Sequence, residues 1–508
     1  MEFLETLATT AGAFLNAWSF FIDPVYVGFM FGGIIVGIIA GILPGVGSIV
    51  GVTLFLPFVF FLTPREAMPF IMGLYSVTFI GGAITTILLG IPGVIGNTAT
   101  LMDGFPMAKK GEAGRALGVA IMSSGMGSLY TAAFAILMVP LVIPLILALT
   151  SAEMVFIILL GLTMIAVLSR EDLLKGLISG FLGIWASLIG FHILTGVHRF
   201  TFGSLYLYDG LSVVAVTLGL FAVPEMIKLM VTGGTIAQQA TKIKGMKEMW
   251  RGVRDVFRHW RLNLGCSVIG YIIGVIPGVG SAVASWISYG QAKQFSKHPE
   301  LYGTGIVDGV IATESANDAR EGGALLTTLA LGIPGSTHYV LLLGAFIMLG
   351  IVPGPELLTT HLELSLSMML TIAISSVIAA VICLTLAPQL AKIAYVPGRI
   401  LAPVVLTVIF LGVFAYNQLF PDLFVVVIFG GIGFLLDRLG YNKPAFILGF
   451  ILGTMFEKYL FISLQAWGDL FFLRPGSLGL LIAIVAFLAF DPIKNWFGRR
   501  SKRRDSKA

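Results

Sequence analysis

Polar and ionisable side chains gather in one short segment, Glu314-Ser-Ala-Asn-Asp-Ala-Arg-Glu321, which leads directly into the apolar run Ala324–Ile333. Ionisable groups at the entrance to a membrane-type segment are costly, and by default they indicate a functional site. We therefore predict that the side chains of Ser315 and Asn317 bind a ligand. An ordinary solvated loop that ends in a helix-capping acid is the alternative.

The two acids Glu314 and Asp318 of this segment are candidates for coupling ligand binding to a cation. Removal from water disfavours the charged form of a carboxyl, so a buried acid can exchange a proton near neutral pH. Asp318 in particular favours a proton as the coupled cation. A purely structural role is the alternative for both acids.

A second set of polar residues follows the two Gly-Ile-Pro-Gly sequences at 90–93 and 332–335. These residues are Asn97 and Thr98 after the first sequence, and Ser336, Thr337 and His338 after the second. The N-terminus of a half-helix presents free N–H groups and a partial positive charge, which suits a carboxylate. We predict that both sets bind an anion. Plain helix capping is the alternative, and His338 could also be structural.

Interrupted helices are needed to position these side chains. Gly41-Ile-Leu-Pro-Gly-Val-Gly-Ser48 recurs as Gly274-Val-Ile-Pro-Gly-Val-Gly-Ser281, and each copy is followed by one Gly-Ile-Pro-Gly sequence. Gly and Pro break helices, and broken helices within a membrane are tolerated where they line a cavity. Matching breaks in two halves of a chain indicate the substrate site of a secondary transporter. The predicted break residues are Pro44, Gly45, Gly47, Ser48, Pro92, Gly93, Pro277, Gly278, Gly280, Ser281, Pro334 and Gly335.

The composition indicates a membrane protein. Of 508 residues, 57% are hydrophobic and 11% are charged, whereas roughly a quarter of a typical soluble domain is charged. Counting uncharged runs of about 20 residues predicts an all-α polytopic protein with about eleven to thirteen membrane segments, including re-entrant ones. A soluble protein with a large core does not fit this composition.

Basic residues predict the orientation. The loop from Lys242 to Arg261 holds seven basic and two acidic residues, and the tail after Phe497 is strongly basic. The positive-inside rule places both, and with them the C-terminus, in the cytoplasm. The net charge of +5 is thus explained without nucleic acid. Apolar residues from Met246 to Trp260 recur at helical spacing and predict a helix in the headgroup plane, with a partner-docking helix as the alternative.

The segment before the first Pro-Gly-Val-Gly is acidic, and the segment before the second is the basic loop. We therefore predict two inverted structural repeats, with a parallel repeat as the alternative. The predicted parts are a first half at 1–230, a basic cytoplasmic linker with an interfacial helix at 231–263, a second half at 264–490 and a basic cytoplasmic tail at 491–508.

The sequence carries no motif for catalysis. Pro44-Gly-Val-Gly-Ser48 lacks the Gly-Lys-Ser/Thr of a nucleotide loop, and no HExxH, Gly-x-Ser-x-Gly or Cys/His cluster is present. We predict a gradient-driven carrier that is not an enzyme and needs no cofactor, with a channel or an intramembrane enzyme as alternatives. No metal site is predicted apart from Na⁺ near the Pro-Gly-Val-Gly-Ser breaks, where freed carbonyl groups could coordinate the ion.

Several motifs in order resemble one family. They include Asp103-Gly-Phe-Pro-Met-Ala-Lys-Lys110, Glu314-Ser-Ala-Asn-Asp318, Leu331-Gly-Ile-Pro-Gly-Ser336 and Val352-Pro-Gly-Pro-Glu356. Together they resemble the large membrane subunit (TctA family) of the tripartite tricarboxylate transporters of prokaryotes, and the resemblance spans nearly the whole chain.

The resemblance implies a multi-pass permease in the cytoplasmic membrane. It further implies a small four-helix membrane subunit and an extracytoplasmic binding protein as partners. Transport in such a family is uptake of citrate and other organic carboxylates by alternating access, driven by Na⁺ or H⁺. A stand-alone carboxylate carrier of the same fold, without partners, is the alternative, and a homo-oligomer is compatible with both.

The chain departs from the family pattern at the expected site. It has Gly81-Gly82-Ala83 where Gly-Gly-Ser is expected, and Asn317-Asp318 where a doubled Asn is usual. Arg320 and Glu321 replace small residues. Lost polar groups in the first half and gained charges in the second leave the choice among carboxylates open. The charged motif from Asp103 to Arg115 is expected at a membrane face, where it would set topology or docking, with a direct role in substrate binding as the alternative.

Overall fold

The computed structural model of the chain describes residues 2–43, 51–53, 55, 59, 61–168, 173–192, 195–232, 245–277, 280–336, 338–395 and 398–486. In these ranges the protein is helical, apart from one antiparallel pair of two-residue strands, β1 (Gly190–Phe191) and β2 (His198–Arg199). Six helices are long and apolar enough to cross a membrane, and six further apolar helices have 10–17 residues. The prediction of an all-α polytopic membrane protein is confirmed.

The chain forms two compact units, each assembled from two separate segments. The first unit comprises 1–144 and 212–434. Its helices and helical turns are α1 (Glu2–Ala17), η1 (Trp18–Ile22), α2 (Pro24–Ile42), α4 (Pro64–Leu89), η2 (Ile95–Thr98), η3 (Thr100–Met102), α5 (Gly104–Met107), η4 (Ala108–Glu112), α6 (Ala113–Leu147), α9 (Val213–Thr217), η6 (Leu218–Ala222), α10 (Val223–Thr232), α11 (Met246–Arg258), α12 (Trp260–Val275), α13 (Ser281–Phe295), η7 (Pro299–Leu301), α14 (Val307–Leu331), α15 (Tyr339–Met348), α16 (Pro355–Thr359), α17 (Leu362–Leu390), η8 (Ala391–Tyr395), α18 (Gly398–Asn417) and α19 (Phe420–Leu439). Because both units combine early and late segments, they do not follow the predicted halves, whose boundaries stay a prediction.

The second unit comprises 145–211 and 435–508. In its described part it contains α7 (Ser151–Leu168), α8 (Leu173–Ser187), β1, β2, η5 (Leu205–Asp209), α20 (Lys443–Trp467) and η9 (Gly468–Leu473). Arg199 of β2 forms a two-pronged ion pair with Glu457 of α20, with N–O distances of 2.5 and 2.9 Å. This pair fastens the strands to α20.

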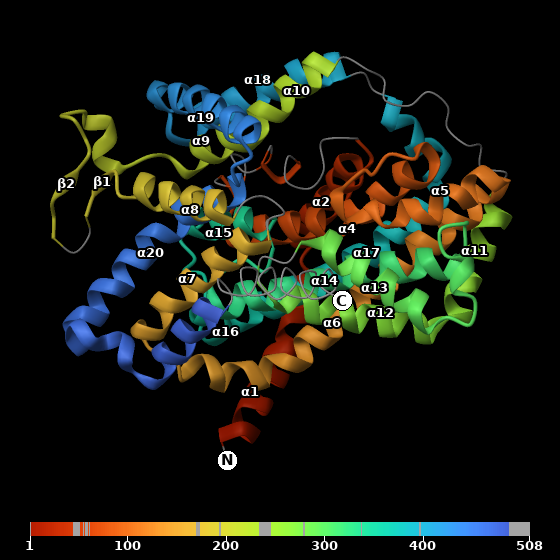
Figure 1. Cartoon of the computed structure of the whole chain (residues 1–508), viewed down its shortest axis with the longest axis horizontal. Coiled ribbons are helices and arrows are strands. Elements are labelled where there is room, and N and C mark those ends of the chain that lie inside the picture. The colour runs from red at the N-terminus through yellow and green to blue at the C-terminus, as the bar shows by residue number, and fades with distance from the viewer. Residues whose placement is uncertain are drawn as a thin grey trace, which may run out of the picture. The chain divides into compact units, whose positions relative to one another are not determined.

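Two helix pairs dominate the first unit, α2 with α4 and α12 with α14; α13 also packs along α14 (Figure 1). Both pairs rest on glycine contacts. A Cβ on Gly41 of α2 would lie 2.1 Å from the carbonyl oxygen of Thr78, and one on Gly274 of α12 would lie 2.2 Å from that of Arg320. Only glycine permits this approach, and these glycines occupy the same position in the two copies of the repeated motif.

The second helix of each pair also ends in the same way. Gly90 ends α4 with φ 71°, and Gly332 ends α14 with φ 67°. Glycine enters this left-handed conformation without steric penalty, and it is a common helix stop. The predicted Gly-Ile-Pro-Gly breaks are therefore real helix ends in both halves.

The chain beyond each stop folds back onto its helix through one hydrogen bond. The amide of Gly93 donates to the hydroxyl of Thr86 at 3.3 Å, and the amide of Gly335 donates to that of Thr328 at 3.0 Å. In both halves the glycine that donates follows the threonine that accepts by seven residues. The repeat therefore exists in local structure, whereas the inverted direction of its halves across a membrane stays a prediction.

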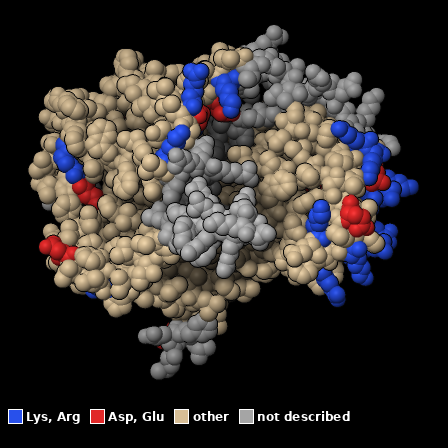
Figure 2. Space-filling view, in the orientation of Figure 1, with Lys and Arg blue, Asp and Glu red and all other residues tan. Residues whose placement is uncertain are grey.

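Helix α11 lies on the first turns of α6. Its residues Met249 and Val253 are buried, and the Nε of Arg115 on α6 lies 2.6 Å from the Oδ2 of Asp255. Trp250 and Phe257 are exposed, and Lys and Arg side chains gather over this helix at one edge of the molecule (Figure 2). The segment is thus helical as predicted, and it docks on its own chain by one face. Its place in the headgroup plane stays a prediction, and 233–244 lie outside the described residues.

Candidate functional site

The polar segment singled out in the sequence forms the middle of α14, and the solvated-loop alternative is wrong. From Val307 to Ala330 almost every residue of this helix is buried, including its charged residues Glu314, Asp318, Arg320 and Glu321. The neighbouring helices α12, α13 and α4 enclose them. Charged side chains are almost never fully buried unless they are paired, so their partners decide what this site can do.

Glu314 is held by side chains from other elements. Its carboxylate accepts hydrogen bonds from Nδ2 of Asn97 at 3.0 Å, from Oγ of Ser124 at 3.1 Å and from the hydroxyl of Thr100. Asn97 and Thr100 belong to η2 and η3, beyond the break that ends α4, and Ser124 belongs to α6. The carboxylate therefore joins both halves of the chain.

The first-half residues do not cap helices. Val94 and Ala99 precede η2 and η3, and neither turn has a side-chain cap. Asn97 instead reaches Glu314, and its Oδ1 has no hydrogen-bond partner among the described residues. Thr98 bonds only locally, to the carbonyl of Ile95 at 2.9 Å. Thr100, which follows the same break, also bonds to Glu314, a contact that spacing alone could not show.

Asn317 lies where three elements meet. A Cβ on Gly96 would be 2.1 Å from Oδ1 of Asn317 and 2.9 Å from the hydroxyl of Ser281, the first residue of α13. The hydroxyl of Ser285, one turn further along α13, donates to the carbonyl oxygen of Gly96 at 3.0 Å. The predicted residues Asn317 and Ser281 are thus brought together with the first-half break.

Several buried side chains of α14, and of the segment that follows the second break, have polar atoms without a hydrogen-bond partner among the described residues. These atoms are both amide atoms of Asn317, both carboxylate oxygens of Asp318, Nε and Nη1 of Arg320, Oγ of Ser336 and Nδ1 of His338. Buried polar groups are ordinarily satisfied, and exceptions indicate a bound ion, water or ligand. These residues are therefore candidates for binding a polar solute.

Arg320 provides the positive charge of the cluster. Its guanidinium pairs with the carboxylate of Glu321 and lies 5.5 Å from the ring centre of Phe79 on α4. The ring of His338 lies 5.8 Å from the same phenylalanine. Arg320 was read from the sequence as a departure from the family pattern, and its position inside α14 makes it a candidate binding residue.

Two tyrosines close this part of the site. The rings of Tyr75 and Tyr339 stack at 5.6 Å between centres. Tyr75 donates to the carbonyl oxygen of His338, and Tyr339 donates to that of Glu321 at 3.0 Å. These hydrogen bonds fix the segment after the second break against α4 and α14. Aromatic residues in apolar runs give no sequence signal for such a role.

Ser315 faces another helix, where its hydroxyl accepts a hydrogen bond from Nδ2 of Asn263 at 2.6 Å. The described break residues lie just beyond helix ends, namely Pro92 and Gly93 after α4, Pro277 after α12, Gly280 and Ser281 at the start of α13, and Pro334 and Gly335 after α14. Pro44, Gly45, Gly47, Ser48, Gly278 and Thr337 lie outside the described residues. The first predicted Na⁺ position lies there too. Within the described part, no group of three or more His, Cys, Asp or Glu residues could hold a metal ion.

Asp103 has a role that the sequence did not indicate. Its side chain is buried, and its Oδ1 accepts hydrogen bonds from the amides of Gly303, Gly305 and Ile306 at 3.0, 2.7 and 3.0 Å. The hydroxyl of Tyr289 donates to Oδ2 at 2.9 Å. Its place at a membrane face stays a prediction, but its side chain is enclosed by the protein. Asp103 holds the turn from which α14 starts.

The turn before α14 is also enclosed by aromatic residues. The rings of Tyr289 and Tyr302 meet edge to face at 5.4 Å between centres. Burial, with the nearby carboxylate of Asp308, raises the pKa of the Tyr302 phenol to about 12. Tyr302 is therefore neutral at physiological pH.

Known proteins similar to the chain identify its family. The family described as "Tripartite tricarboxylate transporter TctA family" matches residues 27–448. An Agrobacterium vitis protein, described as an uncharacterized 52.8 kDa protein in the TAR-I ttuC' 3'region, is 31% identical over 443 residues, which cover 86% of this chain and 87% of that protein.

A second A. vitis protein, described as an uncharacterized protein in the TAR-II ttuC' 3'region, is 33% identical over 191 residues, which cover 38% of this chain and 79% of that protein. No solved structure matches the chain. The resemblance seen in the sequence is confirmed. The chain belongs to the tripartite tricarboxylate transporter TctA family and is a multi-pass membrane subunit of a transporter.

Proposed function

We propose that this chain is the permease subunit for uptake of an organic carboxylate, of the tricarboxylate or dicarboxylate class. We base this on Arg320. Its guanidinium is fully buried, and two of its nitrogens have no hydrogen-bond partner among the described residues. The planar fork of a guanidinium matches a carboxylate in geometry and charge. Asn317 of α14, and Ser336 and His338 after the second break, carry further buried polar atoms without a partner among the described residues. A polycarboxylate would use such a combination of one charge and several hydrogen-bonding groups.

The same cluster supports coupling to a cation. Glu314, Asp318 and Glu321 are buried with one Arg320, so the group is net negative when all three acids are ionised. An anion entering such a region is opposed by these charges, because they are poorly screened in a low-dielectric interior. Co-binding of Na⁺ or H⁺ offsets that repulsion. Asp318, whose carboxylate oxygens have no hydrogen-bond partner among the described residues, is the candidate cation acceptor.

The transport cycle follows from the arrangement of the first unit. Both helix pairs with their breaks belong to this one compact unit, which supports alternating access by movement of a single body. We place the chain in the cytoplasmic membrane with the C-terminus inside, on the distribution of basic residues. An extracytoplasmic binding protein would deliver the substrate, and a small four-helix subunit would complete the assembly, in keeping with the name of the family.

Substitution of Arg320 tests the proposal. The full chain and the proteins encoded beside it are reconstituted in proteoliposomes with labelled carboxylates. Arg320→Lys keeps the charge but loses the fork, so the Michaelis constant for carboxylates should rise at least about tenfold. Arg254→Lys, the same change at an exposed arginine of α11, is the matched control. Unchanged uptake by a folded Arg320→Lys protein overturns the assignment.

A further inference from the structure

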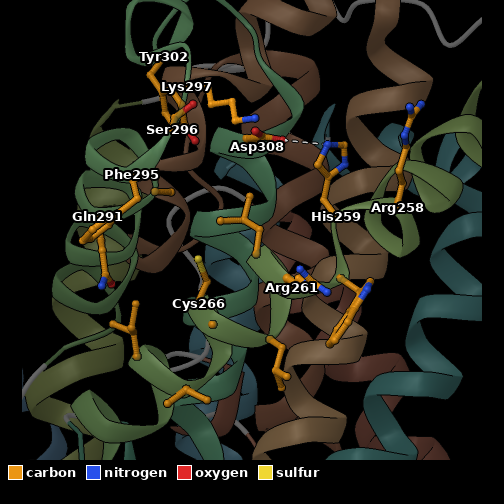
Figure 3. A pocket seen from close by; sticks show the side chains of 17 residues that line it. Arg258, His259, Arg261, Cys266, Gln291, Phe295, Ser296, Lys297, Tyr302 and Asp308 are labelled. Atoms are coloured by element: carbon orange, nitrogen blue, oxygen red, sulfur yellow. Dashed lines mark ion pairs between the residues drawn. The ribbon is translucent and has the colours of Figure 1, made fainter.

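A pocket of about 1420 Å³ lies away from the polar cluster of α14, between α12, α13 and the segment that precedes α14. Figure 3 shows its lining side chains. The side chains of His259 and Asp308 point toward one another in this view, with Lys297 beside them. The pocket is larger than the roughly 300–1,000 Å³ of a typical small-molecule site. Its lining combines basic and apolar side chains.

One end is basic. Arg258, Arg261 and Lys297 line it and are exposed. Asp308 is the single acid among the lining residues, and its Oδ1 lies 3.6 Å from Nε2 of His259. The three remaining cations have no acidic partner within the lining. This end therefore has a surplus of positive charge.

The lining also contains apolar side chains. Among them are Leu264, Val268 and Phe295, of which Val268 and Phe295 are 38% and 78% exposed. Along α12, Arg261, Gly265 and Val268 follow one another at helical spacing, so a single face of the helix passes from basic to apolar. The basic end of this face lies beside α11, whose tryptophan and arginines are exposed.

We propose that this pocket binds one anionic phospholipid. The phosphate of the lipid lies among Arg258, Arg261 and Lys297, and an acyl chain runs along Leu264, Val268 and Phe295. Basic pockets between membrane helices recognise anionic headgroups in this way. A soluble anion such as phosphate would use only the basic end and would leave the apolar wall in water. A zwitterionic lipid would lack the net charge that the surplus of cations favours.

Retention of lipid by the purified full chain tests the proposal, and transport is not needed for the readout. The delipidated protein is offered phosphatidylglycerol or phosphatidylcholine with the same acyl chains, and bound lipid is counted by native mass spectrometry. One phosphatidylglycerol should be retained, at least about tenfold more tightly than phosphatidylcholine. Equal retention of the two lipids overturns the proposal.

Matched variants locate the site. Replacing Arg258, Arg261 and Lys297 by Gln should lower affinity for phosphatidylglycerol at least about tenfold. Replacing the exposed Lys247, Arg251 and Arg254 of α11 by Gln removes the same charge outside the pocket, and affinity should stay within about twofold. An equal loss in both triple variants means binding by general surface charge, and contradicts the pocket.

The apolar side chains proposed to contact the acyl chain are tested separately. This test can be made even if the triple variant does not fold. Phe295→Ser changes a side chain that is 78% exposed, so folding should be preserved while lipid affinity falls about threefold or more. Inorganic phosphate, added at concentrations that match the lipid, should not displace phosphatidylglycerol. Displacement by inorganic phosphate, or an unchanged affinity in Phe295→Ser, overturns the phospholipid as occupant.

Discussion

At the scale of single residues, the buried charges of α14 stand in two different situations. Glu314 accepts hydrogen bonds from Asn97, Thr100 and Ser124. Asp318, one turn further along the helix, has no hydrogen-bond partner among the described residues. A satisfied carboxylate rigidifies its surroundings, whereas an unsatisfied one is expensive unless something binds it. We therefore propose that Glu314 holds the two halves together and that Asp318 binds the coupled cation.

Glu314→Ala should lower the free energy of unfolding by about 1–3 kcal/mol, because three buried donors lose their shared acceptor. Thermal unfolding of the purified protein measures this change. Glu300→Ala, a change at an exposed acid of the same half, should leave the midpoint in place. Equal midpoints for the two variants would show that the hydrogen bonds around Glu314 do not contribute to stability.

Asp318→Asn should remove or alter the dependence of uptake on the imposed cation gradient, because the substituted side chain can neither bind a proton nor carry a charge. Uptake is measured in proteoliposomes under a Na⁺ gradient, under a H⁺ gradient and without either. A variant that responds to both gradients as the unchanged protein does rules Asp318 out as the coupling residue.

At the scale of elements, α14 depends on contacts at its start and along its length. Asp103 binds three backbone amides of the preceding turn, and glycines of α12 let that helix lie directly against it. Both features hold the polar side chains of α14 in register with the first-half break. Substitution of Asp103 or of these glycines should therefore disturb the polar cluster of α14, although neither belongs to it.

Gly274→Ala should destabilise the protein by about 1–3 kcal/mol, because its Cβ would lie 2.2 Å from the carbonyl oxygen of Arg320 and force the helices apart. Gly265→Ala in the same helix meets no heavy atom within 4 Å, so it should be neutral or slightly stabilising. Unfolding midpoints compare the two. A larger loss for Gly265→Ala would contradict the packing described for α12 and α14.

Asp103→Asn should loosen the turn before α14, because hydrogen bonds to a charged oxygen are stronger than those to a neutral one. Hydrogen exchange of the amides of Gly303, Gly305 and Ile306 should become faster, while exchange in the middle of α14 changes less. Asp469→Asn, in the second unit, serves as the control. Unchanged exchange in the turn would mean that Asp103 does not hold it.

Much of this element-level account could be predicted from the sequence. The helix stops at Gly90 and Gly332 follow from local rules for Gly and Pro, which need no knowledge of tertiary contacts. The parts that could not be predicted depend on packing between distant segments. Thr100 and Ser124 donate hydrogen bonds to Glu314, which lies about two hundred residues later in the chain. Neither residue belongs to a recognisable sequence motif. The burial of Asp103 likewise depends on a turn that follows much later.

At the scale of the whole molecule, the chain belongs to the TctA family and folds into two compact units. Both facts are consistent with a carrier whose site lies in the first unit. The first unit carries both repeated helix breaks and the buried charges, so it contains everything that the proposed site needs. The anionic phospholipid proposed for the pocket beside α12 would bind the same unit at a separate place. The activity that we propose for this unit is the transport of carboxylates.

Uptake by the unaltered chain tests that claim most directly. The chain is reconstituted in proteoliposomes with and without the proteins encoded beside it, and labelled mono-, di- and tricarboxylates are offered under an imposed Na⁺ or H⁺ gradient. We predict gradient-dependent accumulation of at least one di- or tricarboxylate, and a requirement for the binding protein would separate a tripartite permease from a stand-alone carrier. Absence of accumulation for every carboxylate, with all partners present and the chain correctly inserted, would contradict the account.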